Sequence, residues 1–211
     1  MSENYLKRFT NLPALIYLLT NRSITLLDPK SWDDTNDSHY LSIYKDVKSL
    51  KTVLALCFTE ASETYHHWRV FADSASGVCI TFNRDKLLRD LRGKSGVRFG
   101  SVDYLTLTAM RKMKNIQDQL PFIKRHGFHD EREFRIIYED KNNTMTTRDV
   151  EIPLTRIERI TLSPWLPKAL DASVKDTIHA IPGCEKIKIA RSTLVSNTEW
   201  KKLASKVSSR A

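Results

Sequence analysis

The chain has 211 residues, of which 41% are hydrophobic and 28% are charged, a balance that is typical of one folded domain and excludes a largely disordered chain. No apolar run approaches the ~18 residues that span a bilayer, and the N-terminus shows no secretion signal, so we expect a cytoplasmic protein without a membrane segment. The net charge of +9 favours an anionic partner, which would be RNA, DNA or an acidic protein that neutralises it.

The first part of the chain is predicted to begin with a short helix and a strand. Residues 11–21 have the pattern of a helix, with Asn11 as a possible N-cap and Pro13 in the first turn. Residues 23–29 follow as a strand that a proline ends, and the polar segment 31–40 is interpreted as a loop with Asx-type turns.

Further along, continuous apolar runs predict buried strands, and stretches with helical periodicity predict helices. In chain order, the expected elements are a strand at 52–59, a helix at 63–73, a strand at 77–83, a helix at 84–93, a strand at 97–105, a helix from 106 that Pro121 breaks or kinks, strands at 131–139, 149–154 and 157–164, a helix at 167–181, a strand at 186–192 and a last helix at 197–209. Strands and helices are mixed without strict βαβ alternation, so we predict an α+β fold with strongly bent sheets. No linker divides the chain, which favours a single domain over residues 1–211, and the tail 205–211 is expected to fray.

The sequence HDEREFRIIYED, residues 129–140, combines a charge cluster with a strand-like run. Glu131, Glu133 and Arg135 stand two apart, so in an extended chain they share one face. Two carboxylates at this spacing suit the cleavage of a glycosidic bond, because a carboxylate stabilises its oxocarbenium-like transition state. The same pattern also fits a solvent-facing edge strand with an ion pair along it, so both interpretations stay open.

Other common kinds of site are not indicated. The histidines at 66, 67, 126 and 129 do not have the spacing of a known zinc site, so no metal site is predicted. No nucleophile elbow, Walker A loop or dinucleotide-binding glycine motif is present, so side chains, arginine above all, would have to hold any phosphate. Three cysteines without a CxxC pair are expected to be reduced and buried.

The segment VLALCFTEASETYHHWRVFADSASGVCITFN resembles the central signature of a bacterial domain family of unknown function. The matching residues are Cys57, Phe58, Thr59, Trp68, Ala72, Asp73, Gly77, Val78, Cys79, Ile80 and Phe82. A Glu-x-Glu-x-Arg strand at 131–135 and the stretches IPLTRIERITLSP and IARSTL continue the resemblance, which covers residues 5–195. The segment SITLLDPKSWDDTND departs from the family pattern, because Trp32-Asp33-Asp34 replaces Phe-Asn-Asp and the final proline is missing.

The opening RFTNLPALIYLLTNRSITLL resembles ADP-ribosyltransferases that modify nucleic acids. The resemblance implies an ADP-ribosyltransferase-like fold of bent mixed or antiparallel sheets flanked by helices, with NAD as substrate. It places Arg8 and Thr10 on a first strand, Thr59 on a central strand, and Glu131 or Glu133 on a late strand. Arg8 stands where these enzymes usually have histidine.

The same resemblance implies a role for each residue. Glu133 would hold the nicotinamide ribose and stabilise the oxocarbenium ion, and Glu131 would orient or deprotonate the acceptor. Thr59 would brace the catalytic carboxylate, and Arg8 would bind the pyrophosphate or the adenosine ribose.

Stacking on nicotinamide or on an acceptor base is expected from Tyr65 or Trp68. For several of these residues a structural role is also open from the sequence: Trp68 suits an apolar core, Thr59 a local cap, and Arg8 plain surface.

Three functions are compatible with the sequence. The first is an NAD-dependent ADP-ribosyltransferase toxin that modifies nucleic acid, RNA in preference, and resembles the toxins of phage-defence modules that an antitoxin neutralises. The second is a non-catalytic, basic nucleic-acid-binding subunit. The third is a metal-dependent nuclease that uses Asp130, Glu131 and Glu133, although no lysine follows at the usual spacing.

Overall fold

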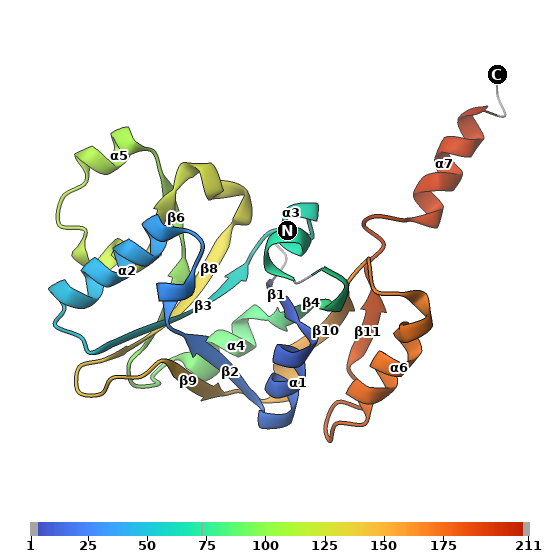
Figure 1. Cartoon of the computed structure of the whole chain (residues 1–211), viewed down its shortest axis with the longest axis horizontal. Helices are drawn as coiled ribbons and strands as arrows, with labels where there is room; N and C mark the ends of the chain where they lie inside the picture. Colours follow the sequence, from blue (N-terminus) through green and yellow to red (C-terminus); the bar gives the residue numbers. More distant parts are fainter. Residues whose placement is uncertain (1–3, 73, 209–211) are drawn as a thin grey trace.

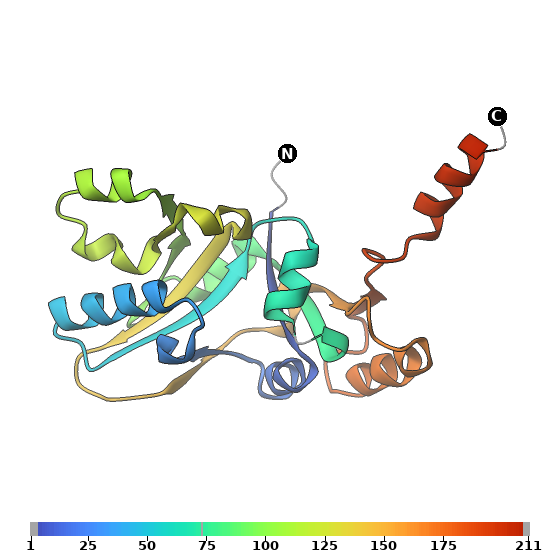
Figure 2. The same cartoon turned by 45° about the horizontal axis from the view of Figure 1, so that its top comes forward.

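The computed structural model describes residues 4–72 and 74–208. Its main body is a 9-stranded mixed sheet with helices on both faces (Figures 1 and 2). The predicted α+β class, with a mixed sheet flanked by helices, is therefore confirmed. No helix within the described ranges is long and apolar enough to cross a membrane.

The elements follow one another with little regular alternation. The strands are β1 (Tyr5–Asn11), β2 (Ser23–Leu27), β3 (Thr52–Thr59), β4 (Gly77–Asn83), β5 (Val97–Ser101), β6 (Asp103–Leu105), β7 (Ile123–Arg125), β8 (Glu133–Asp140), β9 (Thr147–Glu151), β10 (Ile157–Leu162) and β11 (Lys188–Arg191). The helices are α1 (Leu12–Asn21), α2 (Thr35–Val47), α3 (Tyr65–Phe71), α4 (Arg84–Leu91), α5 (Leu107–Lys112), α6 (Lys168–His179) and α7 (Thr198–Ser208).

The sheet has a junction at the end of β3. Its strand order is β11-β10-β4-β1-β3-β2-β9, with β8 paired to β3 and β5 paired to β8. β3 pairs with β8 along its whole length, but it pairs with β1 only at Thr59 and Lys7 and with β2 only at Ala55 and Leu27. The sheet therefore consists of two halves that meet at one paired position.

The two faces of the sheet bury separate apolar clusters, because alternate side chains of a strand point to opposite faces. Leu54, Leu56 and Phe58 of β3 face the main core, which α1 and α4 complete. Val53 and Ala55 face the other way, into a smaller cluster with residues of α2. The charged site described below lies on this second face.

Local capping explains several helix starts. The side chain of Asn11 accepts a hydrogen bond from the Ala14 N–H at the start of α1, and that of Asn83 accepts one from the Lys86 N–H at the start of α4. The N-cap at Asn11 is the one that the sequence predicts.

The prediction of a loop over 31–40 is wrong, because α2 begins at Thr35. The side chain of Asp34 accepts hydrogen bonds from the N–H groups of Asn36 and Asp37, so the Asx residues expected to form turns cap a helix instead. The apolar face of α2, with Leu41 and Tyr44, begins only after this polar first turn.

Three other boundaries differ from the prediction. The expected strand over 97–105 is interrupted at Val102 and forms β5 and β6. Beyond α5, Pro121 lies in a 3₁₀ helix, Gln117–Phe122. The strand expected from 131 starts at Glu133, because Glu131 ends another 3₁₀ helix, His126–Glu131. At the C-terminus α7 reaches Ser208, and residues 209–211 of the tail expected to fray lie outside the described residues.

Gly77 offers a test of this packing. A Cβ at Gly77 would lie 1.8 Å from the carbonyl oxygen of Ala72, so we expect Gly77→Ala to lower the free energy of unfolding by about 3 kcal/mol. The matched control is Gly127→Ala, because a Cβ at Gly127 meets no atom of the described chain within 4 Å. Urea denaturation measures both, and equal stabilities of the two variants would contradict the packing around β4.

Candidate active site

Five charged side chains meet where β8 begins. They are Asp37 of α2, Lys124 of β7, Glu131, Glu133 and Arg135. All are buried or nearly so; Glu133 is 4% exposed and Arg135 is fully enclosed. Three carboxylates face two cations, so the cluster has one carboxylate in excess.

Arg135 holds two of the carboxylates. Its Nε lies 2.6 Å from Glu133 Oε1, and its two terminal nitrogens lie 2.9 and 2.6 Å from the oxygens of Asp37. It also donates to the Pro121 carbonyl at 2.8 Å, and its guanidinium lies 5.0 Å from the ring centroid of Trp32. Arg135 therefore ties β8 to α2 and to the segment before β7.

Lys124 joins the acids on the other side. Its Nζ lies 2.7 Å from Glu131 Oε2, 3.4 Å from Glu133 Oε2 and 3.7 Å from Asp37 Oδ2. Glu131 reaches this point although it precedes the strand, because Arg132 has a left-handed backbone (φ 43°) that turns the chain between the two glutamates. The paired acids are thus brought together by a turn and a lysine, where the sequence predicted an extended row.

The backbone around the glutamates is fixed by two hydroxyl groups. The Thr59 hydroxyl donates to the carbonyl of Glu131 at 2.5 Å and accepts from the Ala61 N–H at 2.9 Å. The Tyr104 hydroxyl accepts from the N–H of Glu133 at 2.7 Å. Thr59 braces the main chain of the acidic segment, whereas the sequence suggested that it would brace a carboxylate.

The two glutamates have opposite pKa shifts. Burial would raise the pKa of Glu133, but Arg135 and then Lys124 outweigh it and lower the pKa to about 2. For Glu131 burial prevails over Lys124, and its pKa is raised. Glu133 is therefore firmly ionised at neutral pH, while Glu131 takes up a proton more readily than an ordinary glutamate.

One row of residues crosses the sheet and ends at Glu133. Successive cross-strand partners place six residues in register: Lys188 of β11, Arg159 of β10, Thr81 of β4, Lys7 of β1, Thr59 of β3 and Glu133 of β8. Directly paired residues lie on the same face of a sheet. Glu133 therefore shares a face with three cations on the other half of the sheet.

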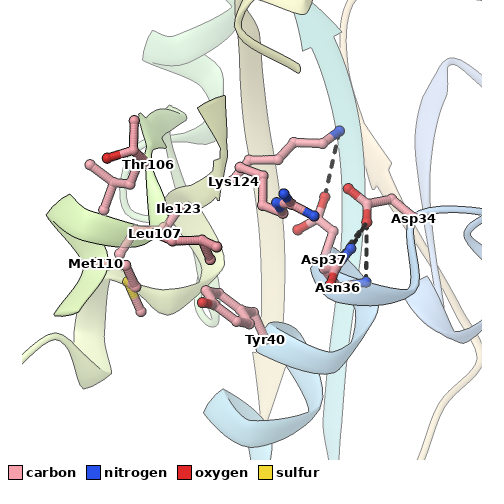
Figure 3. Close-up of a pocket in the computed structure, with 11 residues that line it drawn as sticks. Asp34, Asn36, Asp37, Tyr40, Thr106, Leu107, Met110, Ile123 and Lys124 are labelled. Atoms are coloured by element: carbon pink, nitrogen blue, oxygen red, sulfur yellow. Dashed lines mark hydrogen bonds and ion pairs between the residues drawn. The ribbon is translucent and has the colours of Figure 1, made fainter. Parts of the chain in front are cut away.

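Two hollows are lined by residues that neighbour Glu133 in the cluster or share its row. A groove of about 410 Å³ includes Lys7, Arg159 and Lys188. A cavity of about 150 Å³ includes Asp37 and Lys124 of the charged cluster. Figure 3 shows Asp34, Asn36 and Lys124 on one side of this cavity, Leu107 and Met110 on the other, and Tyr40 between them.

Arg8 and Thr10 lie on the first strand, β1, as the sequence predicted, with their side chains on the face of the main core. They pair in register with Ile80 and Val78 of the main core, so they lie on the other face of β1 from Lys7. Arg8 is half-buried, and burial lowers its pKa to about 10, with the Cys57 thiol opposing this shift. Lys7 rather than Arg8 shares a face with Thr59 and Glu133.

Of the two residues expected to stack on a ligand, Trp68 is not available. Its side chain is fully buried and lies edge-on to Phe9, with ring centroids 5.1 Å apart, so it is a core residue. Tyr65 is 55% exposed and lies edge-on to Trp165.

Asp37 and Lys124 are site residues that the sequence does not predict. Neither stands in a periodic pattern, and Asp37 was assigned to a loop. The only signal is the segment SWDDTND, which the family resemblance covers and which contains Asp37.

A lysine stands among the acids of the cluster. Among residues 4–72 and 74–208, no group of three or more His, Cys, Asp or Glu is placed to hold a metal ion. Lys124 lies where the carboxylates of Asp37, Glu131 and Glu133 converge. Asp130 points away, with its side chain 87% exposed and 3.0 Å from His129.

No protein-family model matches the chain, and no curated protein matches it in sequence. Among solved structures, it is similar to DarT from Thermus sp. 2.9 in complex with carba-NAD+, with 8% sequence identity and a TM-score of 0.46 over 91% of this chain and 97% of that chain. The site is therefore interpreted from its own geometry.

The lowered pKa of Glu133 predicts a specific pH dependence. Its ordinary value is 4.5 and its value in the fold is about 2, so the ionised carboxylate stabilises the fold above pH ~4.5 and this contribution, roughly 3 kcal/mol at most, is lost as the pH falls toward 2. We expect Glu133→Gln to be less stable than the parent at pH 7, with a difference that shrinks between pH 4.5 and 2.

Urea denaturation at several pH values measures this difference. The exposed Glu151 provides the control, since Glu151→Gln should follow the parent at every pH. If the difference in free energy of unfolding between Glu133→Gln and the parent stays constant down to pH 2, the ionised, paired state of Glu133 is contradicted.

Proposed function

We propose that this protein is an NAD-dependent ADP-ribosyltransferase in which Glu133 is the catalytic carboxylate. The observation that carries the proposal is the position of Glu133. It is ionised and held by Arg135 at 2.6 Å, it lies 3.4 Å from the cavity-lining Lys124, and it is in one row with the groove-lining Lys7. When the bond between nicotinamide and ribose breaks, positive charge develops on the ribose. A fixed carboxylate in a site shielded from water stabilises that charge.

Glu131 suits a different step. Nicotinamide leaves with the electron pair of the broken bond, and the acceptor then forms a bond to the ribose carbon and loses a proton. The raised pKa of Glu131 fits a group that takes this proton, because a general base works best when its pKa approaches the operating pH. In many enzymes, two neighbouring carboxylates whose pKa values are shifted in opposite directions take two different catalytic roles.

The proposed acceptor is nucleic acid, RNA in preference. Exposed cations follow the cavity-lining Met110 at Arg111, Lys112 and Lys114, and Arg125 lines the cavity itself. They would attract phosphates and repel a protein guanidinium, while Tyr40 on the cavity wall offers an aromatic face to a base.

Of the residues expected to bind the cofactor, Thr59 and Tyr65 fit this proposal. Thr59 fixes the acidic segment, and Tyr65 exposes its ring. Arg8 and Thr10, on the other face of β1, would not meet a ligand at Glu133 from the groove.

The biological setting belongs to the same proposal. A transferase that modifies RNA in its own cytoplasm has to be restrained, and an antitoxin of acidic character would complement the net charge of +9. We propose the role of a toxin in anti-phage defence on this basis.

The second candidate is a non-catalytic nucleic-acid-binding subunit, which the net charge favours. The nuclease fits less well, because Asp130 is turned away from Glu131 and Glu133.

Turnover of NAD tests the function directly. Purified protein should release nicotinamide from NAD when single-stranded RNA is present, and RNA should gain mass as ADP-ribose. Glu133→Gln should lower the rate at least a hundredfold, because the transition state loses its charged partner. Liquid chromatography with mass detection measures both products.

Glu151→Gln is again the control, and it should retain full activity. Circular dichroism should show that Glu133→Gln is folded at neutral pH. Full activity in folded Glu133→Gln would remove Glu133 from the mechanism, and salt-sensitive RNA binding without any NAD turnover would favour the non-catalytic subunit.

A further inference from the structure

The groove contains three cations, of which Lys7 donates to the carbonyl of Ala61 at 3.1 Å. It runs over the face of β1, β4, β10 and β11, and its lining residues are Tyr5, Lys7, Ser62, Glu63, Cys79, Thr81, Glu158, Arg159, Thr161 and Lys188. Arg159 and Lys188 are direct cross-strand neighbours, and like charges in that position destabilise a sheet. Neither side chain forms a hydrogen bond or ion pair with another residue of the described ranges. An anion bound between them would remove this repulsion.

Other polar groups of the groove point to the same centre. The hydroxyl of Thr81, between Lys7 and Arg159 in the row, is buried and lies beside the thiol of Cys79, with which it interacts. Burial raises the pKa of the Cys79 thiol to about 12, Glu63 adds to this shift, and Lys7 and Arg159 oppose it. Glu63, Lys7 and Arg159 therefore all lie near the Cys79 thiol, which lines the groove.

The carboxylates of the groove are already bound. Glu63 accepts a hydrogen bond from the Ser192 hydroxyl, and Glu158 accepts one from the Asn83 amide at 3.2 Å. Carboxylates beside phosphate-binding cations suit a nucleotide, whose ribose hydroxyls donate to acids. A continuous phosphodiester strand would be repelled by them, so the groove fits a dinucleotide better than a polyanion.

The spacing of the row also fits. Neighbouring strands lie ~4.8 Å apart, which puts Lys7 ~10 Å and Arg159 ~19 Å from Glu133 along the sheet. A dinucleotide that presents its nicotinamide ribose to Glu133 has to place its two phosphates and its adenosine to one side, and the groove is the hollow on that side.

We propose that this groove binds the pyrophosphate and adenosine half of NAD, with Lys7 and Arg159 beside the phosphates, Lys188 next to Arg159, and the ring of Tyr5 against adenine. The inference rests on the proposed function, since it assumes that NAD is the substrate. It assigns the cofactor to β1, β4, β10 and β11, on the opposite face of β1 from Arg8.

The test measures NAD affinity by isothermal titration calorimetry in full-length protein that carries Glu133→Gln, so that no turnover occurs. The double variant Arg159→Glu/Lys188→Glu should bind NAD at least tenfold more weakly, because it replaces two attractive charges by repulsive ones. Thr81→Val, which keeps the shape of the side chain, should bind severalfold more weakly with an unchanged melting temperature.

The matched control is Lys51→Glu/Lys141→Glu. It changes the net charge by the same amount, but both exposed residues lie just beyond the ends of β3 and β8 that are farthest from Thr59 and Glu133. NAD affinity should stay within twofold of the parent, and this variant also calibrates the general effect of charge on the binding of a 12-nucleotide single-stranded RNA.

Three results would overturn the inference. The groove variant could bind NAD as well as the parent, it could lose RNA but keep NAD, or Arg8→Met could abolish NAD binding while the groove variant retains it. In each case NAD still binds and the proposed function stands. A parent protein that binds no NAD at all would overturn both proposals.

Discussion

The fold of the site depends on the buried guanidinium of Arg135. A charge taken out of water is costly unless its partners are close and well oriented, and Arg135 meets this condition with Asp37, Glu133 and the Pro121 carbonyl. These partners come from α2, β8 and the segment before β7. Without the guanidinium, Asp37 and Glu133 would keep only their longer contacts to Lys124, so the second face of the sheet is assembled largely around this one side chain.

The same network gives the two glutamates different chemistry. Arg135 contacts Glu133 but not Glu131, and Lys124 is shared between them. With two cations for three carboxylates, the arrangement keeps Glu133 charged and leaves Glu131 as the acid that protonates more easily. The ion pairs that stabilise the fold thus also give the two glutamates opposite pKa shifts.

The sequence was sufficient for the strands and most helices, because apolar runs such as 52–59 and caps such as Asn11 act locally. It also identified Glu131 and Glu133 as a pair. It was not sufficient for α2, since Asp34 can cap a helix or make a turn with the same hydrogen bonds. Lys124 and Asp37 could not be found at all, because their roles arise only when α2, β7 and β8 are packed together.

The single pairing of Lys7 with Thr59 has a mechanical consequence. It is the one direct β1–β3 bridge between the two halves of the sheet within the described ranges. The two halves are therefore joined through β1 and β3 at a single pair of residues. A ligand that contacts Lys7 on one half of the sheet and Glu133 on the other would connect the two halves at this position. Its binding free energy would then add to the stability of the contact between the two halves. The sheet would therefore become more rigid as more of the protein binds the ligand.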